Sequence, residues 1–491
     1  MDAVEAVRRT RSSDTYEEFE RRVTAQADAL RETFAADGFE GGYVLGLELE
    51  GYAVDAEGRL TNVPTEAFER ICERELGRHN AEVNTPASGF DSVGLVKQAR
   101  SLDDCVTRVR QAFSSRDRRF VTDGMWTVGP SQGDLAYLTA TEERDGRPLP
   151  ANLAPNPRYY ALNADIISNG GVELDLPVCR RQFDSIIVES LATSMQAHVQ
   201  MPTEAFPQYF NAALRTAGAV LVLAANAPFL PPGLYTDPDP ERVLTAGVEL
   251  RIPVFESMNV RDPGKVRFPR DIDRPVDVVD RIVADRLCAP YLREWVDDSS
   301  RDGFADEYWE LLHKQGTCWR WVRPVLGPEG PRIEYRILAA QPSTADVIGF
   351  QALVAGLLHG VAVTDHPLLD LPWEAAHESL YAASRDGFDA DLAWVTREGD
   401  RTSDPEQVYP DLFALARTGL RDRGFEPDRV DDLLAPIERR WEERTSPADW
   451  KRAAVRDRLG DGASLEEAIH GMQREYIQRS CANKPFATWD G

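Results

Sequence analysis

Lysine is scarce in this chain of 491 residues, although basic residues as a class are not. Only five of the 56 lysines and arginines are lysines, whereas 82 residues are aspartate or glutamate, which gives a net charge of −26 at pH 7. A GC-rich genome would explain arginine in place of lysine, but not the excess of acids. Because an acidic surface keeps a protein soluble where salt screens its charges, we expect a halophilic source and a cytoplasmic protein. The charge argues against non-specific binding to nucleic acid or to an anionic membrane, which both require a cationic surface.

Several familiar signatures are also missing. The six cysteines are scattered, with no CxxC and no histidine cluster beside them, so the sequence supports neither a zinc site nor a disulfide framework. The N-terminus lacks the apolar core of a signal peptide, and the most apolar stretch, 217–230, is too short to span a bilayer. Neither a Walker A motif nor G-x-G-x-x-G occurs, so phosphate binding cannot be argued from a glycine loop. We therefore expect a soluble protein whose chemistry is carried by other side chains.

The periodicity of the apolar residues predicts an α+β fold with a mainly antiparallel sheet and helices on one side. Strands are expected at 43–54, 80–85, 124–129, 190–201, 317–324 and 332–338. Helices are expected at 14–36, 64–76, 91–113, 207–226 and 275–296, and then at 344–360, 373–386, 405–422, 427–443, 447–458 and 464–480. We divide the chain into an N-terminal helical segment (1–40), a catalytic domain (41–400) and C-terminal helices packed on that domain (401–491).

Four of these strands place polar side chains on a common face, because alternate residues of a strand share a face. In the first strand the leucines at 45, 47 and 49 point one way, and Glu48 and Glu50 point the other. The other three strands add Glu82 and Asn84; Gln196, His198 and Gln200; and Arg332, Glu334 and Arg336. Two glutamates alone would be ordinary on a wet sheet face, but four such strands indicate a site. Carboxylates with one imidazole suit Mg²⁺ or Mn²⁺, and arginines suit phosphate, so the set is equipped for phosphoryl transfer.

At these residues the chain resembles the type 2 glutamate–cysteine ligases, a family of bacterial and archaeal carboxylate–amine ligases. The resemblance covers about residues 43–395 and consists of motifs that follow one another in the family's order. These motifs are LGLELE (45–50), NAEVNT (80–85), NPRY (156–159), AHVQ (197–200), AANAPF (224–229), WRWVRP (319–324), RIEYR (332–336) and HESLYAASRDGFDA (377–390). Each motif alone is unspecific, and their number and order carry the resemblance.

The resemblance implies a glutamine-synthetase-like catalytic sheet and an ATP-dependent ligase. ATP would phosphorylate the side chain of glutamate or a similar acid, and the amine of cysteine, or another amine, would attack the acyl phosphate. Carried over by position, the metal ligands would be Glu48, Glu50, Glu82, His198 and Glu334. Arg336 and Arg323 would act on the phosphoryl group or the substrate carboxylate, with Arg320, Arg332 and Arg251 as cofactor-binding helpers. The substrates would be small molecules, the sequence is compatible with a homo-oligomer, and with its composition the resemblance implies a haloarchaeal source.

Two departures from the family pattern keep other hypotheses open. Gln200 stands where the family has the second histidine of His–x–His, and extra residues occur at the N-terminus and near 140–155. A non-catalytic relative that binds a nucleotide or a metabolite is therefore an alternative. A third hypothesis, a serine hydrolase, rests on GPSQG (129–133), which satisfies G-x-S-x-G with Ser131 as nucleophile. That motif needs a helix directly after the serine, and the residues that follow lack helical periodicity, so we favour a turn.

Overall fold

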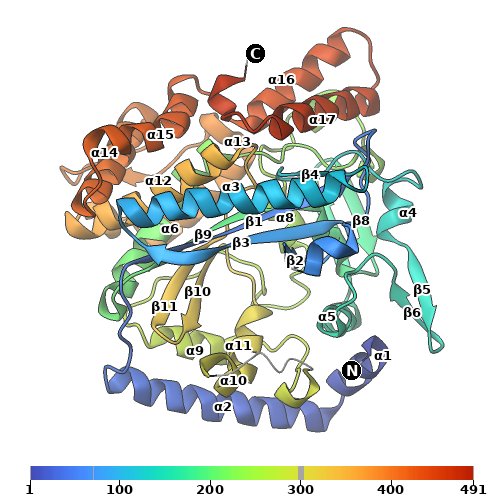
Figure 1. The fold of residues 1–491 in the computed structure, drawn as a ribbon, viewed down its shortest axis with the longest axis horizontal. Coiled ribbons are helices and arrows are strands. Elements are labelled where there is room, and N and C mark those ends of the chain that lie inside the picture. The colour runs from blue at the N-terminus through green and yellow to red at the C-terminus, as the bar shows by residue number, and fades with distance from the viewer. Residues whose placement is uncertain (1, 70, 297–302, 490–491) are drawn as a thin grey trace.

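The strand with the alternating leucines lies inside a seven-stranded antiparallel sheet in the computed structural model, which describes residues 2–69, 71–296 and 303–489 (Figure 1). The strands follow the order β10 (Val322–Gly327), β11 (Gly330–Tyr335), β9 (Met195–Gln200), β1 (Val44–Val54), β3 (Asn80–Gly89) and β2 (Glu73–Arg74), with β4 (Arg119–Val121) paired to β1. Three small hairpins are β5–β6 (Thr141–Arg144, Arg147–Pro150), β7–β8 (Val172–Leu176, Cys179–Phe183) and β12–β13 (Trp394–Val395, Arg401–Thr402). The predicted α+β class with an antiparallel sheet is confirmed.

The apolar face of the sheet packs on helices. Leu45, Leu47 and Leu49 are at most 2% exposed, and burial of each such side chain contributes about 1.5–3 kcal/mol to folding. The helices α3 (Ser92–Ser114), α6 (Phe206–Ala224) and α12 (Thr344–Val363) contact this face. By length and composition α12 could cross a membrane, but 89% of its most apolar window is buried inside the protein. We therefore interpret α12 as a core helix. The helix α6 is also a core helix, and its last residues form the first part of the apolar stretch 217–230.

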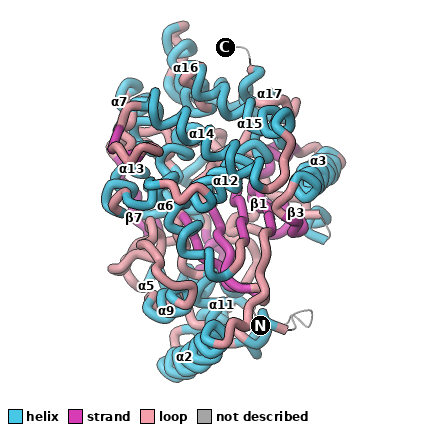
Figure 2. Tube along the Cα trace, turned by 90° about the vertical axis from the view of Figure 1, so that its left-hand side faces the viewer, coloured by secondary structure: helices cyan, strands magenta, loops and turns pink. Residues whose placement is uncertain are grey.

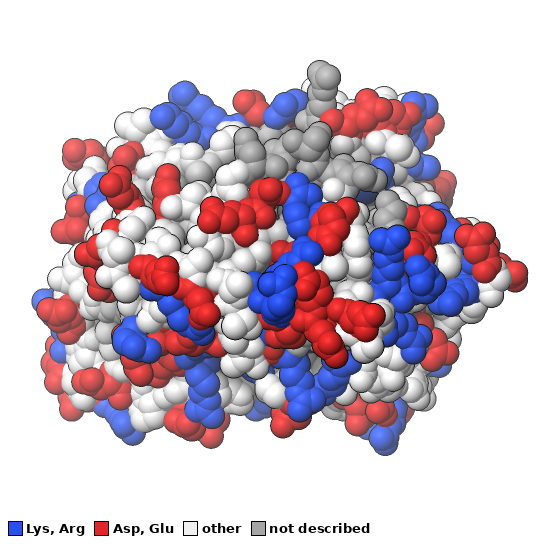
Figure 3. Space-filling model, turned by 90° about the horizontal axis from the view of Figure 1, so that it is seen from below, with Lys and Arg blue, Asp and Glu red and all other residues white. Residues whose placement is uncertain are grey.

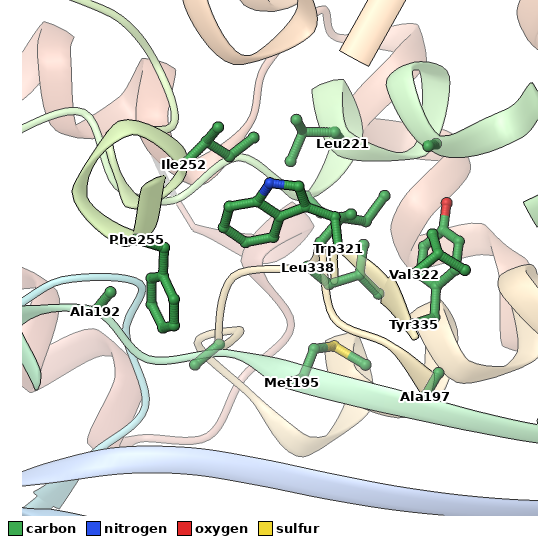
Figure 4. Close-up of a cluster of buried hydrophobic side chains, with 14 of the residues drawn as sticks. Ala192, Met195, Ala197, Leu221, Ile252, Phe255, Trp321, Val322, Tyr335 and Leu338 are labelled. Carbon is green, nitrogen blue, oxygen red and sulfur yellow. The ribbon is translucent and has the colours of Figure 1, made fainter. Parts of the chain in front are cut away.

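A cluster around Trp321 fixes the start of the edge strand β10. Figure 4 shows Trp321 between Ile252 and Phe255 on one side and the sheet residues on the other. The rings of Trp321 and Phe255 have centroids 5.7 Å apart, and Trp321 Nε1 donates a hydrogen bond of 2.9 Å to Glu256. Since the strand begins only at Val322, the predicted strand 317–324 is wrong in its first half, and simple alternation cannot place side chains before that residue.

The helices after residue 343 follow the predicted ranges within a few residues: α12, α13 (Trp373–Asp386), α14 (Pro405–Asp422), α15 (Pro427–Glu442), α16 (Pro447–Gly460) and α17 (Leu465–Cys481). Their starts carry strong signals, since α16 and α17 each open with a capping box, at Ser446 and Ser464. Figures 1 and 2 place these helices on one side of the sheet and α2 (Ser13–Ala35) on the other. The division of the chain into three parts stays a prediction.

Three predicted elements are wrong. Residues 64–76 form only a short 3-10 helix, Thr65–Glu69, followed by β2, and the predicted helix 275–296 is limited to α9 (Asp277–Ala284). Residues 124–129 form no strand, but a single bridge joins Met125 to Ala192. The apolar periodicity did not predict α1 (Ala3–Thr10), α5 (Pro157–Ser168) or α11 (Trp309–Gly316). These short elements owe their conformation to tertiary packing, which overrides weak local propensity.

Acidic and basic side chains are intermixed on the face that carries α2 (Figure 3). Arg22 of α2 lies between Glu294 and Glu310, at 2.7 Å and 2.9 Å, and also pairs with Glu18. The basic residues are thus distributed among many acids, and a cavity that gathers five arginines stands out against this background.

Candidate functional site

Adjacent strands bring the predicted polar residues together in register. Glu50 lies directly opposite Glu82 of β3, and Glu334 of β11 lies opposite His198 of β9. Glu48 has Asn84 on one side and Gln196 on the other. Because directly opposed side chains of neighbouring strands are about 5 Å apart, the four strands form a continuous polar surface.

The carboxylates of this surface form two groups. In the first, Glu48, His198 and Glu334 each offer a ligand atom, and these atoms lie within 4.8 Å of one another. His198 Nε2 is 3.2 Å from a carboxylate oxygen of Glu48. In the second, the ligand atoms of Glu50, Glu75 and Glu82 also lie within 4.8 Å of one another. Glu75 was not among the residues predicted from the sequence. The five predicted metal ligands are therefore divided between two neighbouring groups.

Arginines compensate the first group. Arg323 Nη2 donates to one oxygen of Glu334 at 2.8 Å, and Arg336 Nη1 donates to the other at 2.6 Å. Although burial by itself would raise the pKa of Glu334, the two arginines hold this pKa well below its usual value. Arg336 also donates to Gln196, whose amide nitrogen donates to Glu50 at 2.7 Å, so that Gln196 joins the two groups. Arg323 and Arg336 thus stabilise the ionised form of Glu334.

The second group has too little positive charge. Burial and the neighbouring carboxylates raise the pKa of Glu75 to about 8, and they raise the pKa of Glu82 and Glu189 as well. For Glu50 burial also dominates, and Arg336 only reduces the shift. One oxygen of Glu189 is buried with no hydrogen-bond partner among the described residues. Crowded carboxylate oxygens that lack cations are a donor set that Mg²⁺ or Mn²⁺ fits.

Two cavities meet at Glu48. The first, which we call the central cavity, has a volume of about 230 Å³. Its acidic and arginine lining residues are Glu48, Glu50, Glu75, Glu82, Glu189, Arg158, Arg323 and Arg336. The second, which we call the histidine cavity, has about 280 Å³ and is lined by Glu48, Asn84, His198, Gln200 and Arg332. The polar face therefore offers two adjoining spaces that share one carboxylate.

The remaining predicted site residues lie at different places. Arg332 Nε donates to His198 at 3.1 Å in the histidine cavity, and Gln200 there donates to the carbonyl oxygen of Glu329 at 3.1 Å. Arg251 lies instead in the protein interior, where it donates to Glu249 and to the carbonyl oxygen of Ile337, both at 2.6 Å. Arg251 lines neither of the two cavities, and its role as a cofactor-binding helper stays a prediction.

Arg320 also points away from the central cavity. It pairs with Asp285 and donates to the carbonyl oxygen of Lys265. The physical reason is that positions 320 and 323 differ in strand parity, so a chain that directs Arg323 toward Glu334 turns Arg320 to the other face; Arg320 also precedes β10. A role for Arg320 in cofactor binding stays a prediction that this geometry does not support.

Other side chains at the site were missed for identifiable reasons. Glu75 was assigned to a helix that does not form, and Glu189 lies in a 3-10 helix, Ile186–Leu191. A lone acid in the apolar run IIVESL was a signal for Glu189. Arg158, quoted only as part of a motif, follows Asn156, whose side chain caps α5 by accepting from the Arg158 backbone nitrogen. Ser131, the alternative nucleophile, lies on an exposed turn.

Comparison with known proteins adds a family and a fold. The model of glutamate-cysteine ligase family 2 matches residues 44–483. A glutamate–cysteine ligase from Francisella tularensis, solved in complex with AMP, is similar with a TM-score of 0.53 and 12% identity, over 90% of this chain and 89% of that one. A bifunctional glutathione synthetase from Pasteurella multocida has a TM-score of 0.47 and 12% identity, over 93% of this chain and 55% of that one. No curated protein sequence matches the chain. The first likeness shows a shared fold, and the second is too low to carry an argument.

Proposed function

Since the chain belongs to glutamate-cysteine ligase family 2, we propose that it joins a carboxylate to an amine in an ATP-dependent reaction through an acyl phosphate, with Mg²⁺ or Mn²⁺. The observation that carries this proposal is that two carboxylate groups lie on one face together with Arg323 and Arg336, which both pair with Glu334. A face so rich in oxygen ligands suits divalent cations, and the arginines suit a phosphoryl group.

The chemistry assigns a task to each part of the face. An oxygen of the substrate carboxylate attacks the terminal phosphorus of ATP, and the bond from that phosphorus to ADP breaks. The amine then attacks the acyl carbon, the C–N bond forms, inorganic phosphate leaves with the electron pair of the broken C–O bond, and the amine loses a proton. Divalent cations, when bound, would neutralise phosphate charge. Arg336 and Arg323, held in place by Glu334, would orient the transferred group and stabilise its charge.

The two cavities suggest where the substrates bind. The histidine cavity has Arg332 beside His198 and Glu48, and this combination of cation and ligand groups suits a nucleotide phosphate. The AMP bound to the Francisella tularensis ligase supports nucleotide use. The central cavity contains Arg158, Arg323 and Arg336, which suit the carboxylates of glutamate or a similar acid.

Hydroxylamine tests the activation step without knowledge of the natural amine, because it is small and traps an acyl phosphate as a hydroxamate. At high salt, with ATP, Mg²⁺ and glutamate, we expect hydroxamate and ADP in equal amounts. Neither should form without the acid or after EDTA treatment. If a panel of amino and dicarboxylic acids yields no hydroxamate and no ADP, the ligase proposal is wrong.

Gln200 favours the second candidate, a relative that binds a nucleotide or a metabolite without turnover. Its side chain lines the histidine cavity, and its neutral amide donates a hydrogen bond to the backbone carbonyl oxygen of Glu329. This candidate predicts ATP binding by calorimetry with no hydroxamate, and restored activity in the variant Gln200→His. Turnover by the unchanged chain would exclude it.

A further inference from the structure

A third cavity, of about 550 Å³, lies beside the central cavity and has a contrasting lining. Five arginines line it, namely Arg267, Arg270, Arg281, Arg320 and Arg323. Among the described residues that line this arginine cavity, Asp285 is the only acid. Its volume falls in the range of roughly 300–1,000 Å³ that is typical of pockets for small-molecule ligands.

The positive charge of the arginine cavity is only partly compensated. Asp285 serves both Arg320 and Arg267, the latter at 3.1 Å. Arg270 pairs with Glu374 at 2.7 Å and Arg323 with Glu334, whereas Arg281 donates to backbone carbonyl oxygens. Burial and then the neighbouring Arg320 lower the pKa of Arg267, and burial and then Arg270 lower the pKa of His377. In a chain with a net charge of −26, such a concentration of cations is a specific feature of this cavity. It favours a ligand that carries a negative charge.

Aromatic rings form another part of the wall. Trp373 lies 4.7 Å from His377 and 5.9 Å from Phe268, measured between ring centroids. The guanidinium of Arg270 stacks over Trp373 at 3.5 Å from the ring centroid. A flat ring on the ligand would add a layer to this stack, because aromatic rings attract one another beyond the burial of their surface.

The three cavities form a series, in which shared residues connect each one to the next. Glu48 lines the histidine cavity and the central cavity, and Arg323 lines the central cavity and the arginine cavity. The segment 315–320 separates the last two, with Thr317 and Trp319 on the central side and Gln315 and Cys318 on the other. In a carboxylate–amine ligation the acid must react first with the nucleotide and then with the amine. The acid therefore belongs in the middle, with the nucleotide at the end that holds His198.

Resting on the proposed function, we propose that the arginine cavity binds the amine substrate, and that this amine carries an anionic group and a flat ring and is larger than cysteine. Its anionic group pairs with Arg267 or Arg281, its ring packs on Trp373, and its amine reaches past Arg323 toward the acyl phosphate. The surrounding arginines also favour the uncharged amine over the ammonium ion, since like charges disfavour protonation. An uncharged amine is the form that attacks the acyl carbon.

Comparing amines in the glutamate-dependent release of ADP tests this inference. The probes are L-tryptophan and L-phenylalanine, pyridoxamine 5′-phosphate, L-cysteine and putrescine, with hydroxylamine as the small reference acceptor. We expect kcat/KM for at least one ring-bearing anion to exceed that for cysteine and putrescine at least tenfold. The carboxylate and phosphate arms distinguish the two kinds of anion. If hydroxamate forms but cysteine or putrescine is the better acceptor, the inference is overturned while the ligase proposal stands.

Variants locate the binding site. Arg267→Gln and Trp373→Ala should each lower kcat/KM for the preferred ring-bearing amine at least ten times more than for hydroxylamine, mainly through KM. Arg180→Gln, at an exposed arginine of the β7–β8 hairpin, is the matched control and should change neither value. Two variants are used because Arg267 also contacts Asp285 and could affect folding. If both variants raise KM for ATP and leave KM for the amine unchanged, the cavity belongs to the nucleotide and the inference is wrong.

Discussion

Buried charges occur in two settings in this molecule, and the two differ in how they are compensated. Beneath the C-terminal helices, Asp346 lies 2.8 Å from Arg440, with both side chains fully buried, and Asp123 pairs with Lys451. Arg440 Nη1 donates further hydrogen bonds to the carbonyl oxygen of Leu223 and the amide oxygen of Gln341, so that the charge of each partner is compensated within the chain. On the polar face of the sheet, by contrast, Glu50, Glu75 and Glu82 are packed together with few cations.

These two settings distinguish the charges that stabilise the fold from those that do not. A buried pair that is complete within the chain holds two elements together, whereas a carboxylate cluster without enough cations destabilises the protein until something binds it. We infer that the scaffold pairs stabilise the fold and that the carboxylate cluster is kept for function.

Breaking a scaffold pair should have the largest effect. Arg440→Met leaves Asp346 buried and unpaired, so we expect the free energy of unfolding to fall by about 3–5 kcal/mol. The neighbouring Arg439 provides a matched control, because it makes an exposed pair with Glu443. Arg439→Met should change the free energy of unfolding by less than about 1 kcal/mol. Chemical denaturation at constant salt measures both values, and equal losses would mean that burial of the first pair contributes nothing.

Removing a carboxylate from the site should instead affect activity. Glu82→Gln keeps the size of the side chain and removes one of several like charges, so we expect hydroxamate formation to fall by about 10²–10³-fold. The free energy of unfolding should stay the same or rise, because repulsion among Glu50, Glu75 and Glu82 is reduced. Glu173→Gln, on an exposed hairpin strand, is the control and should change neither value. A loss of stability in Glu82→Gln with full activity would reverse the comparison.

The sequence predicted the polar face better than its surroundings because strands obey a period of two. Once β1, β3, β9 and β11 were identified, alternation alone placed Glu48, Glu50, Glu82, His198 and Glu334 on one face, and the register then aligned them. The long C-terminal helices were predicted for a similar reason, since apolar periodicity and capping serines agree there.

The sequence could not predict side chains whose direction depends on tertiary packing. Glu75 lines the central cavity because residues 73–74 pair with β3, where the sequence had predicted a helix over 64–76. Arg320 precedes its strand and turns toward Asp285, which lies in a loop after α9. The arginine cavity likewise collects residues from segments around 267, 281, 320 and 373, which no local pattern relates.

His79 is a buried titratable group near the site, and we expect it to stabilise the fold as the scaffold pairs do. Its Nε2 donates to the carbonyl oxygen of Ser190 and its Nδ1 accepts from the hydroxyl of Tyr137, so the fold holds a neutral ring. Burial lowers the pKa of His79 to about 4 from an ordinary value of about 6.5. This lowered pKa means that its contribution is fully present above pH 6.5 and is lost as the pH falls toward 4.

The size of this contribution follows from the shift of the pKa and is on the order of 3 kcal/mol. We expect the variant His79→Gln to be less stable than the unchanged protein at pH 7, with the difference shrinking as the pH falls from 6.5 to 5. Denaturation curves of both proteins across this range measure the difference, in which the titration of the shared carboxyl groups cancels. If the difference in the free energy of unfolding does not change with pH, unfolding does not change the pKa of His79, and this prediction is wrong.

A divalent cation should supply the charge that the carboxylate cluster lacks. At 100 times its dissociation constant, Mg²⁺ should raise the free energy of unfolding of the unchanged protein by about 2.7 kcal/mol, measured against NaCl of equal ionic strength. Arg440→Met should gain the same amount, because its defect lies outside the site, whereas Glu82→Gln should gain much less. Equal gains in both variants would place the cation elsewhere. Unequal gains in this order would show that one set of buried charges is completed by the chain and the other by a bound ion.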